Sequence, residues 1–581
     1  MTFLLLVPDD QARIDPEALR RVAGRHTITW IRQDDPASGG AVCFSSLAAV
    51  TRLRTSNGLD ILLIGRVRLD RRAELCCELG VVGRDATFQL PDAELCLLAY
   101  QRWGDEFVRH IHGDYAFAIT DEHKRRVVCA RDRFGIRTLV WSRNHAGFWV
   151  AGSLQNLVSA SGFDCGELDA QWISDFLSDG FCSDPTLSAF RGVRRLAPAH
   201  LLTLDMKGLS TTRYWELRVR APMTLGSAAA YEKEFHTRLD AAIRDRLPAG
   251  RLGISMSGGL DSSTLAAKAV EIGGSQLNVF ARTWIVGGDA DPEVQASVRV
   301  ASYLGLNHTL LEAEDLRVDP CWIDRPTSTP EPSLGVVMPD AYLAEMQAMR
   351  SEAAYWFYGE GPDNALTFEW QMHLRWLLKQ GKWLALPSVV ASYFASKSPR
   401  DWMTTVRSLW GREVRGPNEK WSNPRWVRYP SSPSLKDAPD QWRPRAHQSF
   451  ASALWPALFE GLDAEASEFD IEWRHPFMDL RVLEFLLATP PIPWARHKRL
   501  IRLAMRGRLP EETLKRPKVP LYKDDMEAML RRHLPAMPRQ GDAVEEFVDL
   551  AALPQDPVAY PDIYALTRVP ILQHWLKTRH G

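Results

Sequence analysis

The first part of the chain alternates short apolar runs with polar turns. Residues 1 to about 205 contain runs of four or five apolar residues, which predict β-strands at 61–65, 115–119, 126–130 and 148–151. One stretch, 93–100, has a single apolar face at helical spacing and predicts a helix. The amino-terminal run from Phe3 to Val7 predicts a buried strand and not a signal peptide, because no basic segment precedes it and acidic residues follow.

The spacing changes beyond residue 226, where longer helical patterns alternate with apolar strand-like runs at 252–255, 277–281 and 355–358. Strands that alternate with helices predict a parallel sheet that binds its ligand at the strands' carboxyl ends. The chain therefore reads as α/β, with a β-rich domain at 1–205, a turn-rich linker at 206–225 and a second domain at 226–581.

Within the second domain, the segment 365–450 is rich in aromatic residues. For any single tryptophan, filling a core is the usual role. The alternative interpretation is a partly aromatic wall for a large substrate such as a peptide, because ligand pockets favour aromatic linings. Its tryptophans are Trp370, Trp376, Trp383, Trp402, Trp410, Trp421, Trp426 and Trp442.

The strongest chemical signal follows the strand predicted at 252–255. The string Ser255-Met256-Ser257-Gly258-Gly259-Leu260-Asp261-Ser262-Ser263 leads from a strand through a glycine turn into a helix. Glycines let the backbone approach a ligand, and a helix start offers free N–H groups to a phosphate. The string lacks the Gly-Lys-Ser/Thr ending of a Walker A loop. It resembles the pyrophosphate loop of enzymes that cleave ATP between its α and β phosphates.

Composition narrows the class of protein. The 581 residues are 45% hydrophobic with a net charge of -1, which is typical of a globular protein and predicts neither nucleic-acid nor membrane binding. No apolar stretch is long enough to span a bilayer. The eight cysteines form no Cys-x-x-Cys pair, so we expect reduced thiols in a cytoplasmic protein and no zinc site.

Several separated strings resemble the asparagine synthetase B family in the expected order along the chain. The first domain matches at 65–75, 113–118 and 130–137, and the second at 257–263, 359–364, 475–479 and 516–518. The resemblance implies a degenerate class II glutamine amidotransferase domain, which is an Ntn-hydrolase-like β-sandwich. It also implies an α/β ATP-pyrophosphatase domain of the adenine nucleotide α-hydrolase-like type.

One departure from the family changes the expected function. The family's glutaminase uses a cysteine directly after the initiator methionine, and this sequence has Thr2 there. Threonine serves as a nucleophile in other enzymes, but Phe3-Leu4-Leu5-Leu6 also replaces the family's Gly-Ile segment. We therefore expect a domain that keeps its structure and has no glutaminase activity. Such an enzyme needs a nitrogen nucleophile other than ammonia from glutamine.

Two groups within this family use such a nucleophile: β-lactam synthetases and lasso peptide cyclases. The string Gly359-Glu360-Gly361-Pro362-Asp363-Asn364 looks most like the cyclases, because asparagine synthetases usually have Glu in place of Asn364 and β-lactam synthetases usually have Tyr in place of Glu360. The resemblance implies adenylation of an Asp or Glu side chain of a ribosomal precursor peptide, followed by attack of its N-terminal amine. A leader peptidase or precursor-recognition protein is the implied partner.

The resemblance also assigns roles to residues. Asp261 and Asp363 would bind Mg2+, Lys518 would contact the phosphates and the oxyanion, and Glu360 would act as the base. Glu360 could equally order its loop, and Glu293 and His308 match family positions that could be purely structural. Arg282 and Trp284 could border the adenine. The predicted ATP site comprises Ser255, Met256, Ser257, Gly258, Gly259, Leu260, Asp261, Ser262, Ser263, Thr283, Gly359 and Lys518.

Three functions compete at this stage. The first is an ATP-dependent peptide macrolactam synthetase. The second is a small-molecule amide synthetase, either β-lactam-forming or ammonia-dependent. The third is an inactive scaffold that binds nucleotide or a partner enzyme, which the retained Asp261, Asp363 and Lys518 oppose.

Overall fold

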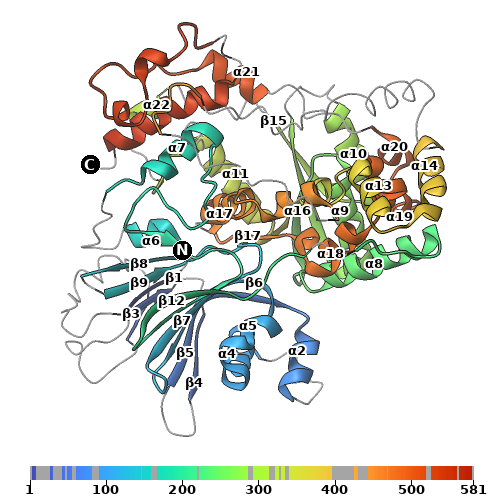
Figure 1. Cartoon of the computed structure of the whole chain (residues 1–581), viewed down its shortest axis with the longest axis horizontal. Coiled ribbons are helices and arrows are strands. Elements are labelled where there is room, and N and C mark those ends of the chain that lie inside the picture. The colour runs from blue at the N-terminus through green and yellow to red at the C-terminus, as the bar shows by residue number, and fades with distance from the viewer. Residues whose placement is uncertain are drawn as a thin grey trace.

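The computed structural model describes residues 3–7, 27–30, 42–45, 49–54, 60–81, 90–145, 147–158, 167–218, 221–285, 292–312, 321–325, 329–333, 339–395, 424–429, 442–467, 469–517, 525–558, 560 and 562–578. Within these ranges every helix is too short or too polar to traverse a bilayer. Two antiparallel sheets form the amino-terminal part, and a parallel sheet flanked by helices lies beside them (Figure 1).

The two antiparallel sheets each have six strands. The first has the order β10 (Arg194–Arg195), β8 (Val140–Asn144), β9 (Gly147–Ala151), β1 (Phe3–Val7), β3 (Val42–Ser45) and β2 (Thr27–Trp30). The second has the order β12 (Gly208–Arg213), β11 (His200–Asp205), β7 (Arg126–Arg131), β6 (His112–Asp121), β5 (Asp60–Asp70) and β4 (Ala49–Arg54). The four predicted strands and the predicted amino-terminal strand are confirmed.

Alternation of apolar residues lets β1 serve two cores. Phe3 and Leu5 pack between the sheets with Ile64 of β5, whereas Leu4 and Leu6 face the other way. The outer face of the second sheet is covered by α2 (Arg72–Leu79) and α4 (Asp92–Trp103). The resulting sandwich confirms the expected Ntn-like architecture of the first domain.

The outer face of the first sheet is covered by α7 (Ala170–Asp179) and by α22 (Ile563–Thr578), which lies near the carboxyl end of the chain. Figure 1 shows α22 and α21 (Asp525–Arg532) beside α7. The carboxyl-terminal segment of the predicted second domain thus completes the core of the first. Sequence pattern cannot show this, because an apolar helix face does not identify the sheet that it covers.

Part of the predicted linker 206–225 is a strand. β12 continues the second sheet as a hairpin with β11, and Gly208 adopts a φ of +114° after the turn. The strand reads as linker in the sequence because it lies at the sheet edge, where its polar residues from Ser210 to Arg213 are exposed. An edge strand needs only one hydrogen-bonded neighbour and little apolar surface.

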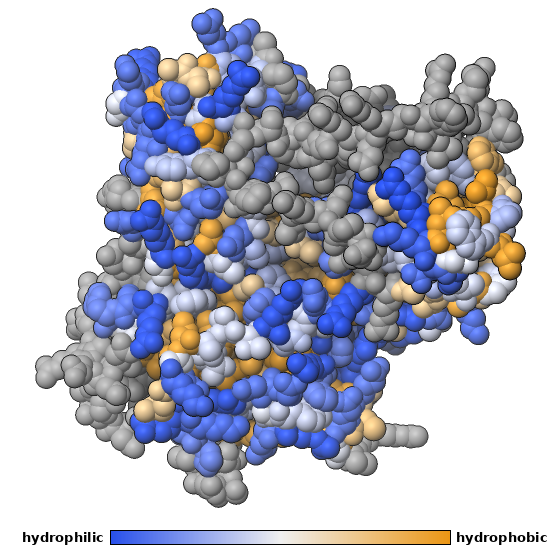
Figure 2. All heavy atoms as spheres, viewed as in Figure 1, coloured by the Kyte–Doolittle hydropathy of each residue, from blue (hydrophilic) through white to orange (hydrophobic). Residues whose placement is uncertain are grey.

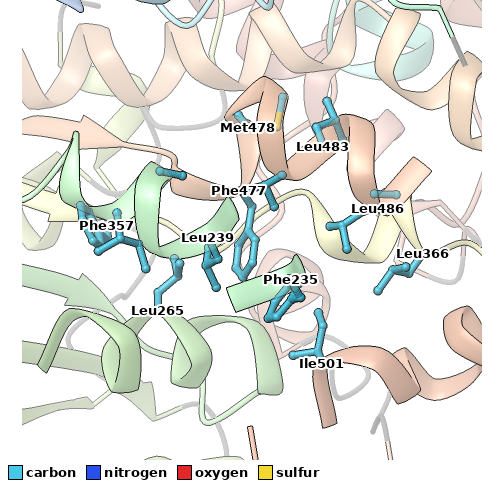
Figure 3. Close-up of a cluster of buried hydrophobic side chains, with 14 of the residues drawn as sticks. Phe235, Leu239, Leu265, Phe357, Leu366, Phe477, Met478, Leu483, Leu486 and Ile501 are labelled. Carbon is cyan, nitrogen blue, oxygen red and sulfur yellow. The ribbon is translucent and has the colours of Figure 1, made fainter. Parts of the chain in front are cut away.

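The third sheet has five parallel strands in the order β15 (Asn307–Glu312), β14 (Asn278–Ile285), β13 (Arg251–Ser255), β16 (Tyr355–Phe357) and β17 (Glu472–Arg474). The helices α8 (Ala228–Arg244), α9 (Leu260–Gly273), α10 (Pro292–Leu304) and α18 (Leu480–Ala488) pack around it. Figure 3 shows part of this core, in which Phe235 and Leu239 of α8 lie with Phe477 from the segment just before α18. The predicted parallel sheet is confirmed.

The strand order reverses at β13, because β14 pairs on one side of it and β16 on the other. A crevice at the strands' carboxyl ends is the usual ligand site at such a point. Gly253 in the middle of β13 is required by packing. A Cβ atom there would lie 2.1 Å from the ring of Trp356, which is fully buried in β16.

Buried arginines connect the two domains. Asp463 of α17 (Leu454–Ser467) accepts ion pairs from Arg66 at 2.8 Å and from Arg137. Arg246, just after α8, pairs with Asp70 of β5 at 2.8 Å and with Asp479 at 2.7 Å. We call this set the arginine seam. Because charges removed from water must be paired, the seam fixes the docking of the two domains.

A small cavity borders the seam between the domains. It has a volume of about 20 Å³, which is room for roughly one water molecule. Its lining includes Asp70, Asp114, Arg246, Asp479 and His112. Asp70, Asp479 and Asp245 also approach one another, but Arg246 and Arg481 already neutralise these carboxylates. The cluster is therefore an ion-pair network and not a metal site.

Six cysteines in the described part of the chain have free thiols. Cys76, Cys96, Cys129 and Cys182 are buried, whereas Cys77 and Cys321 are exposed. Burial raises the pKa of the Cys96 and Cys129 thiols, so these side chains stay protonated and behave as small apolar groups.

The first prediction concerns the arginine seam. Asp463→Asn leaves Arg66 and Arg137 buried without their carboxylate, so we expect the free energy of unfolding to fall by about 3–5 kcal/mol. Urea denaturation followed by circular dichroism measures the change. The matched control is Glu167→Gln, which removes an exposed ion pair with Arg191 and should cost less than about 1 kcal/mol. Equal effects of the two variants would contradict a stabilising seam.

The second prediction concerns acid sensitivity. Burial, reinforced by neighbouring arginines, lowers the pKa of His112 and of His475 to about 3. Both imidazoles are neutral in the fold but bind protons below about pH 6.5 once unfolded. The stabilisation that these two neutral histidines provide should therefore be fully present above pH 7. It should fall by up to about 2.7 kcal/mol per pH unit as the pH drops from 6 toward 3.

Urea unfolding at pH 7.5, 6.5 and 5.5 tests this slope. The variants His112→Gln and His475→Gln should each flatten it, since each removes one of the protons taken up on unfolding. A wild-type profile that is flat across this range would refute the assignment.

Candidate active site

The loop between β13 and α9 is shaped by two glycines. Gly258 has a φ of +67°, and a Cβ atom there would lie 2.4 Å from the carbonyl oxygen of Glu293. Gly259 has no side chain and precedes the first residue of α9, so the start of this 14-residue helix is open to a ligand. The structure thus places the predicted glycine turn where backbone N–H groups and the positive end of the helix dipole converge.

Hydroxyl groups brace the same loop. The backbone N–H of Ser257 donates to Oγ of Ser262 at 3.3 Å, and the N–H of Gly259 donates to Oγ of Ser257 at 3.3 Å. Ser263 and Thr264, in the first turns of α9, are buried, and Oγ1 of Thr264 donates to the carbonyl of Leu260 at 2.7 Å. Ser257 and Ser262 are therefore the hydroxyls best placed to contact a phosphate.

A lysine that the sequence interpretation missed lies at the centre of the site. Nζ of Lys498 is 2.5 Å from Oδ2 of Asp261 and 2.7 Å from Oδ1 of Asp363. The three residues come from α9, α12 (Pro362–Ala365) and the turn before α19 (Arg499–Ala504). The two aspartates predicted as one site are thus brought together by a shared cation.

The backbone at Lys498 is unusual. His497 and Lys498 both have positive φ values, 49° and 53°, which residues with side chains seldom adopt. Such conformations persist where the surrounding structure enforces them, and they cluster at functional sites. Burial alone would lower the pKa of the Lys498 ammonium, but Asp261 and Asp363 raise it above its usual value. Lys498 is therefore a cation at neutral pH.

Gly359 and Glu360 border the loop from the neighbouring strand. They follow β16, and a Cβ atom on Gly359 would lie 3.1 Å from the backbone nitrogen of Ser262. Burial and the nearby Glu360 carboxylate raise the pKa of Tyr358 to about 12. The N–H of Tyr358 donates to the carbonyl of Arg474 at 3.1 Å, which ties this motif to β17.

Thr283 and His308 support the loop from β14 and β15. Oγ1 of Thr283 donates to the carbonyl of Met256 at 2.6 Å and lies 2.9 Å from Nε2 of His308. Desolvation lowers the pKa of His308, which favours a neutral ring that donates this bond. Thr283 and His308 therefore hold the backbone of Met256, so we assign them a positioning role.

Other predicted residues lie in different settings. The Arg282 guanidinium is engaged by Glu345 and Glu352 of α11 (Pro339–Glu352), and Trp284 is partly exposed on the same strand. Lys518 lies outside the described residues, as does Thr2. The roles predicted for these two residues stay predictions.

The aromatic segment 365–450 divides between core and surface. Trp442 is buried, and its Nε1–H donates to the carbonyl of Leu487 at 3.1 Å. The ring of Trp376 packs edge-on against it, with the two ring centroids 5.0 Å apart. Trp426 belongs to the core beneath α22 and contacts Tyr560. Trp383 is exposed. Trp402, Trp410 and Trp421 lie outside the described residues.

The residues present fit a magnesium nucleotide. Mg2+ prefers oxygen ligands, and Asp261 and Asp363 aim carboxylate oxygens at one position. The loop adds backbone N–H groups with no Cβ in the way at Gly258, Gly259 and Gly359. The arrangement can bind the phosphates of a nucleotide and stabilise the charge that develops when pyrophosphate leaves.

Comparison with known proteins agrees with this geometry. A family model described as a glutamine amidotransferase domain matches residues 77–215, and one described as asparagine synthase matches residues 234–564. The Bacillus subtilis protein named asparagine synthetase [glutamine-hydrolyzing] 3 is 23% identical over 74% of this chain and 70% of its own length.

Two further relatives match over a shorter stretch. A putative asparagine synthetase [glutamine-hydrolyzing] of Mycobacterium bovis is 30% identical over 37% of this chain, and the amidase chry2 of Gibberella zeae is 25% identical over 42%. The matches span 34% and 37% of those proteins. Because the asparagine synthase model covers more than half of the chain, the chain belongs to the asparagine synthase family of ATP-dependent, amide-forming ligases.

Proposed function

We propose that this chain activates a carboxylate by transferring AMP to it from ATP, and then joins the activated carbon to an amine. The observation that carries the proposal is the convergence of Asp261, Asp363 and Lys498 beside the glycine loop. In the first step the carboxylate attacks the α phosphorus and pyrophosphate leaves. In the second step the amine attacks the acyl carbon and AMP leaves, so the product contains one water fewer than the reactants.

Each group has a defined task in this proposal. The loop from Ser257 to Ser262 binds the departing phosphates through N–H and hydroxyl donors. Magnesium held by Asp261 and Asp363 would neutralise charge on those phosphates. Lys498 supplies a buried positive charge for the phosphates and the oxyanion, and it is no base because its pKa is raised. Glu360 then remains the candidate that accepts the amine's proton.

For the finer specificity we propose lasso peptide macrolactam formation. The sequence has Thr2 where glutaminases of this family have cysteine, and Phe3-Leu4-Leu5-Leu6 replaces the family's Gly-Ile segment. In this proposal the nucleophile is therefore not ammonia from glutamine. Aromatic residues follow Asp363 closely, and Phe368 and Trp370 pack against Tyr393. An aromatic wall suits a peptide better than a free amino acid. The amine is then the N-terminus of the same peptide, and a peptidase that releases this amine is the implied partner.

An asparagine-synthetase-like function with free ammonia is the second candidate, because the relative from Bacillus subtilis carries that name and matches most of the chain. The two functions differ in substrate and share the first half-reaction. Purified protein is incubated with ATP, magnesium and a peptide that has a free N-terminus and one internal Asp or Glu. Formation of AMP and a product lighter by one water supports the cyclase. Unchanged peptide, together with asparagine made from aspartate and ammonium, contradicts it.

The third prediction tests the cation at the centre of the site. Lys498→Met removes the charge shared by Asp261 and Asp363, so pyrophosphate release should fall by about 100-fold or more. Asp261→Asn should have a comparable effect. Lys515→Met is the matched control, since that lysine is largely exposed and its loss should leave the rate unchanged. Pyrophosphate release near the wild-type rate in Lys498→Met would refute the role.

The fourth prediction separates the half-reactions. Glu360→Gln removes the proposed base, so amide formation should slow by about 100-fold while ATP–pyrophosphate exchange changes little. The substitution keeps the size of the side chain beside Tyr358. If exchange and amide formation fall equally, Glu360 orders the loop and is not the base.

A further inference from the structure

A helical hairpin at the surface exposes apolar residues at its tip. It consists of α13 (Trp370–Lys379), a turn with the short helix η6 (Trp383–Ala385), and α14 (Leu386–Ala395). Leu384 is 97% exposed and Trp383 is 63% exposed, and Leu378 and Val390 are exposed near them. We call these four residues the apolar tip. Figure 2 shows hydrophobic residues gathered at the margin where Figure 1 places α13 and α14.

The charge of the hairpin has a single sign. Residues 370–395 contain Arg375, Lys379 and Lys382 and no aspartate or glutamate. Lys379 and Lys382 flank the turn, and both are exposed beside the apolar tip. The whole chain has a net charge of -1, from which we expected no membrane binding. A net charge does not report a local excess of positive charge such as this one.

The hairpin holds its tip in place. The N–H of Gly381 donates to the carbonyl of Leu378 at 3.1 Å, the N–H of Lys382 donates to that of Leu377 at 2.9 Å, and Gly381 has a φ of +66°. These bonds close the end of α13. On the inner side, the ring of Trp370 packs on that of buried Tyr393, with the two ring centroids 4.5 Å apart. The exposed apolar residues are therefore presented by a braced turn.

We propose that the apolar tip inserts into the surface of an anionic lipid bilayer. Tryptophan favours the interface between headgroups and acyl chains, and neighbouring lysines are attracted to anionic headgroups. The tip is convex, because a residue that is 97% exposed has no walls around it. A tip without walls offers no groove to a peptide, whereas a lipid layer deforms around a protruding side chain.

The position of the hairpin gives this contact a consequence for the active site. α13 and α14 pack on the segment Pro491–Ala495, which leads within three residues to Lys498, and α13 follows shortly after Asp363. Insertion of the apolar tip would thus hold the synthetase site near the membrane. The lipid contact itself does not depend on the reaction that the site performs.

Flotation of the full-length protein with lipid vesicles tests the proposal. We expect binding to vesicles of phosphatidylcholine mixed with phosphatidylglycerol, weaker binding at high salt, and little binding to pure phosphatidylcholine. Trp383→Ser combined with Leu384→Ser should lower the partition coefficient by about tenfold or more, since it removes the apolar contact. Lys379→Gln combined with Lys382→Gln should abolish the preference for anionic vesicles.

The matched control is Met206→Ser, which removes a side chain that is 78% exposed in the turn between β11 and β12 and should leave binding unchanged. Unaltered thermal unfolding shows that each variant is folded. Wild-type protein that stays with the free fraction for both vesicle types overturns the proposal. So does a double variant that binds vesicles normally, or one whose only defect is a raised KM for a peptide substrate, which would make the tip a peptide-docking surface.

Discussion

The pairing of buried arginines with carboxylates is the constraint on which this architecture depends. Arg246 is almost fully buried, and its charge is satisfied only when Asp70 of the first domain and Asp479 of the second are both in place. Asp463 makes the reciprocal arrangement with Arg66 and Arg137. An ion left alone in such a place costs several kcal/mol, so separation of the domains is strongly disfavoured.

The seam also reaches the catalytic sheet. Arg137 lies 3.3 Å from Glu472 at the start of β17, and Arg474 at the end of that strand donates to the carbonyl of Arg246. β17 in turn pairs with β16, whose carboxyl end leads to Gly359 and Glu360. The first domain therefore has a structural task, because it fixes the edge of the sheet that presents the active site. The helix α22 adds to this by completing the core of the first domain.

The centre of the site depends on segments that are far apart in the chain. Asp261 and Asp363 carry like charges, and their approach is stabilised by Lys498, whose pKa they raise in return. The loop can adopt this conformation because Gly258 has no side chain, since a Cβ atom there would collide with the backbone at Glu293. Backbone clearance, a helix start and one shared cation meet at this loop, and Thr283 and His308 hold the carbonyl of Met256 in place.

Local patterns were enough to determine eight of the 17 strands that the structure describes, together with the parallel sheet and the glycine loop. Hydrophobic periodicity and turn-forming residues are signals that span only a few residues. Runs such as 252–255 and the string from Ser257 to Ser263 therefore predict their own local structure. Strand order then placed Asp261 and Asp363 at one edge, as expected from β13 and β16. The role of Lys498 was decided only by tertiary structure, because a lysine among Arg496, His497 and Arg499 reads as a solvated turn until its partners are known. The same holds for α22, for β12 and for the arginine seam, since burial and charge pairing are properties of the folded neighbours and not of the residue itself.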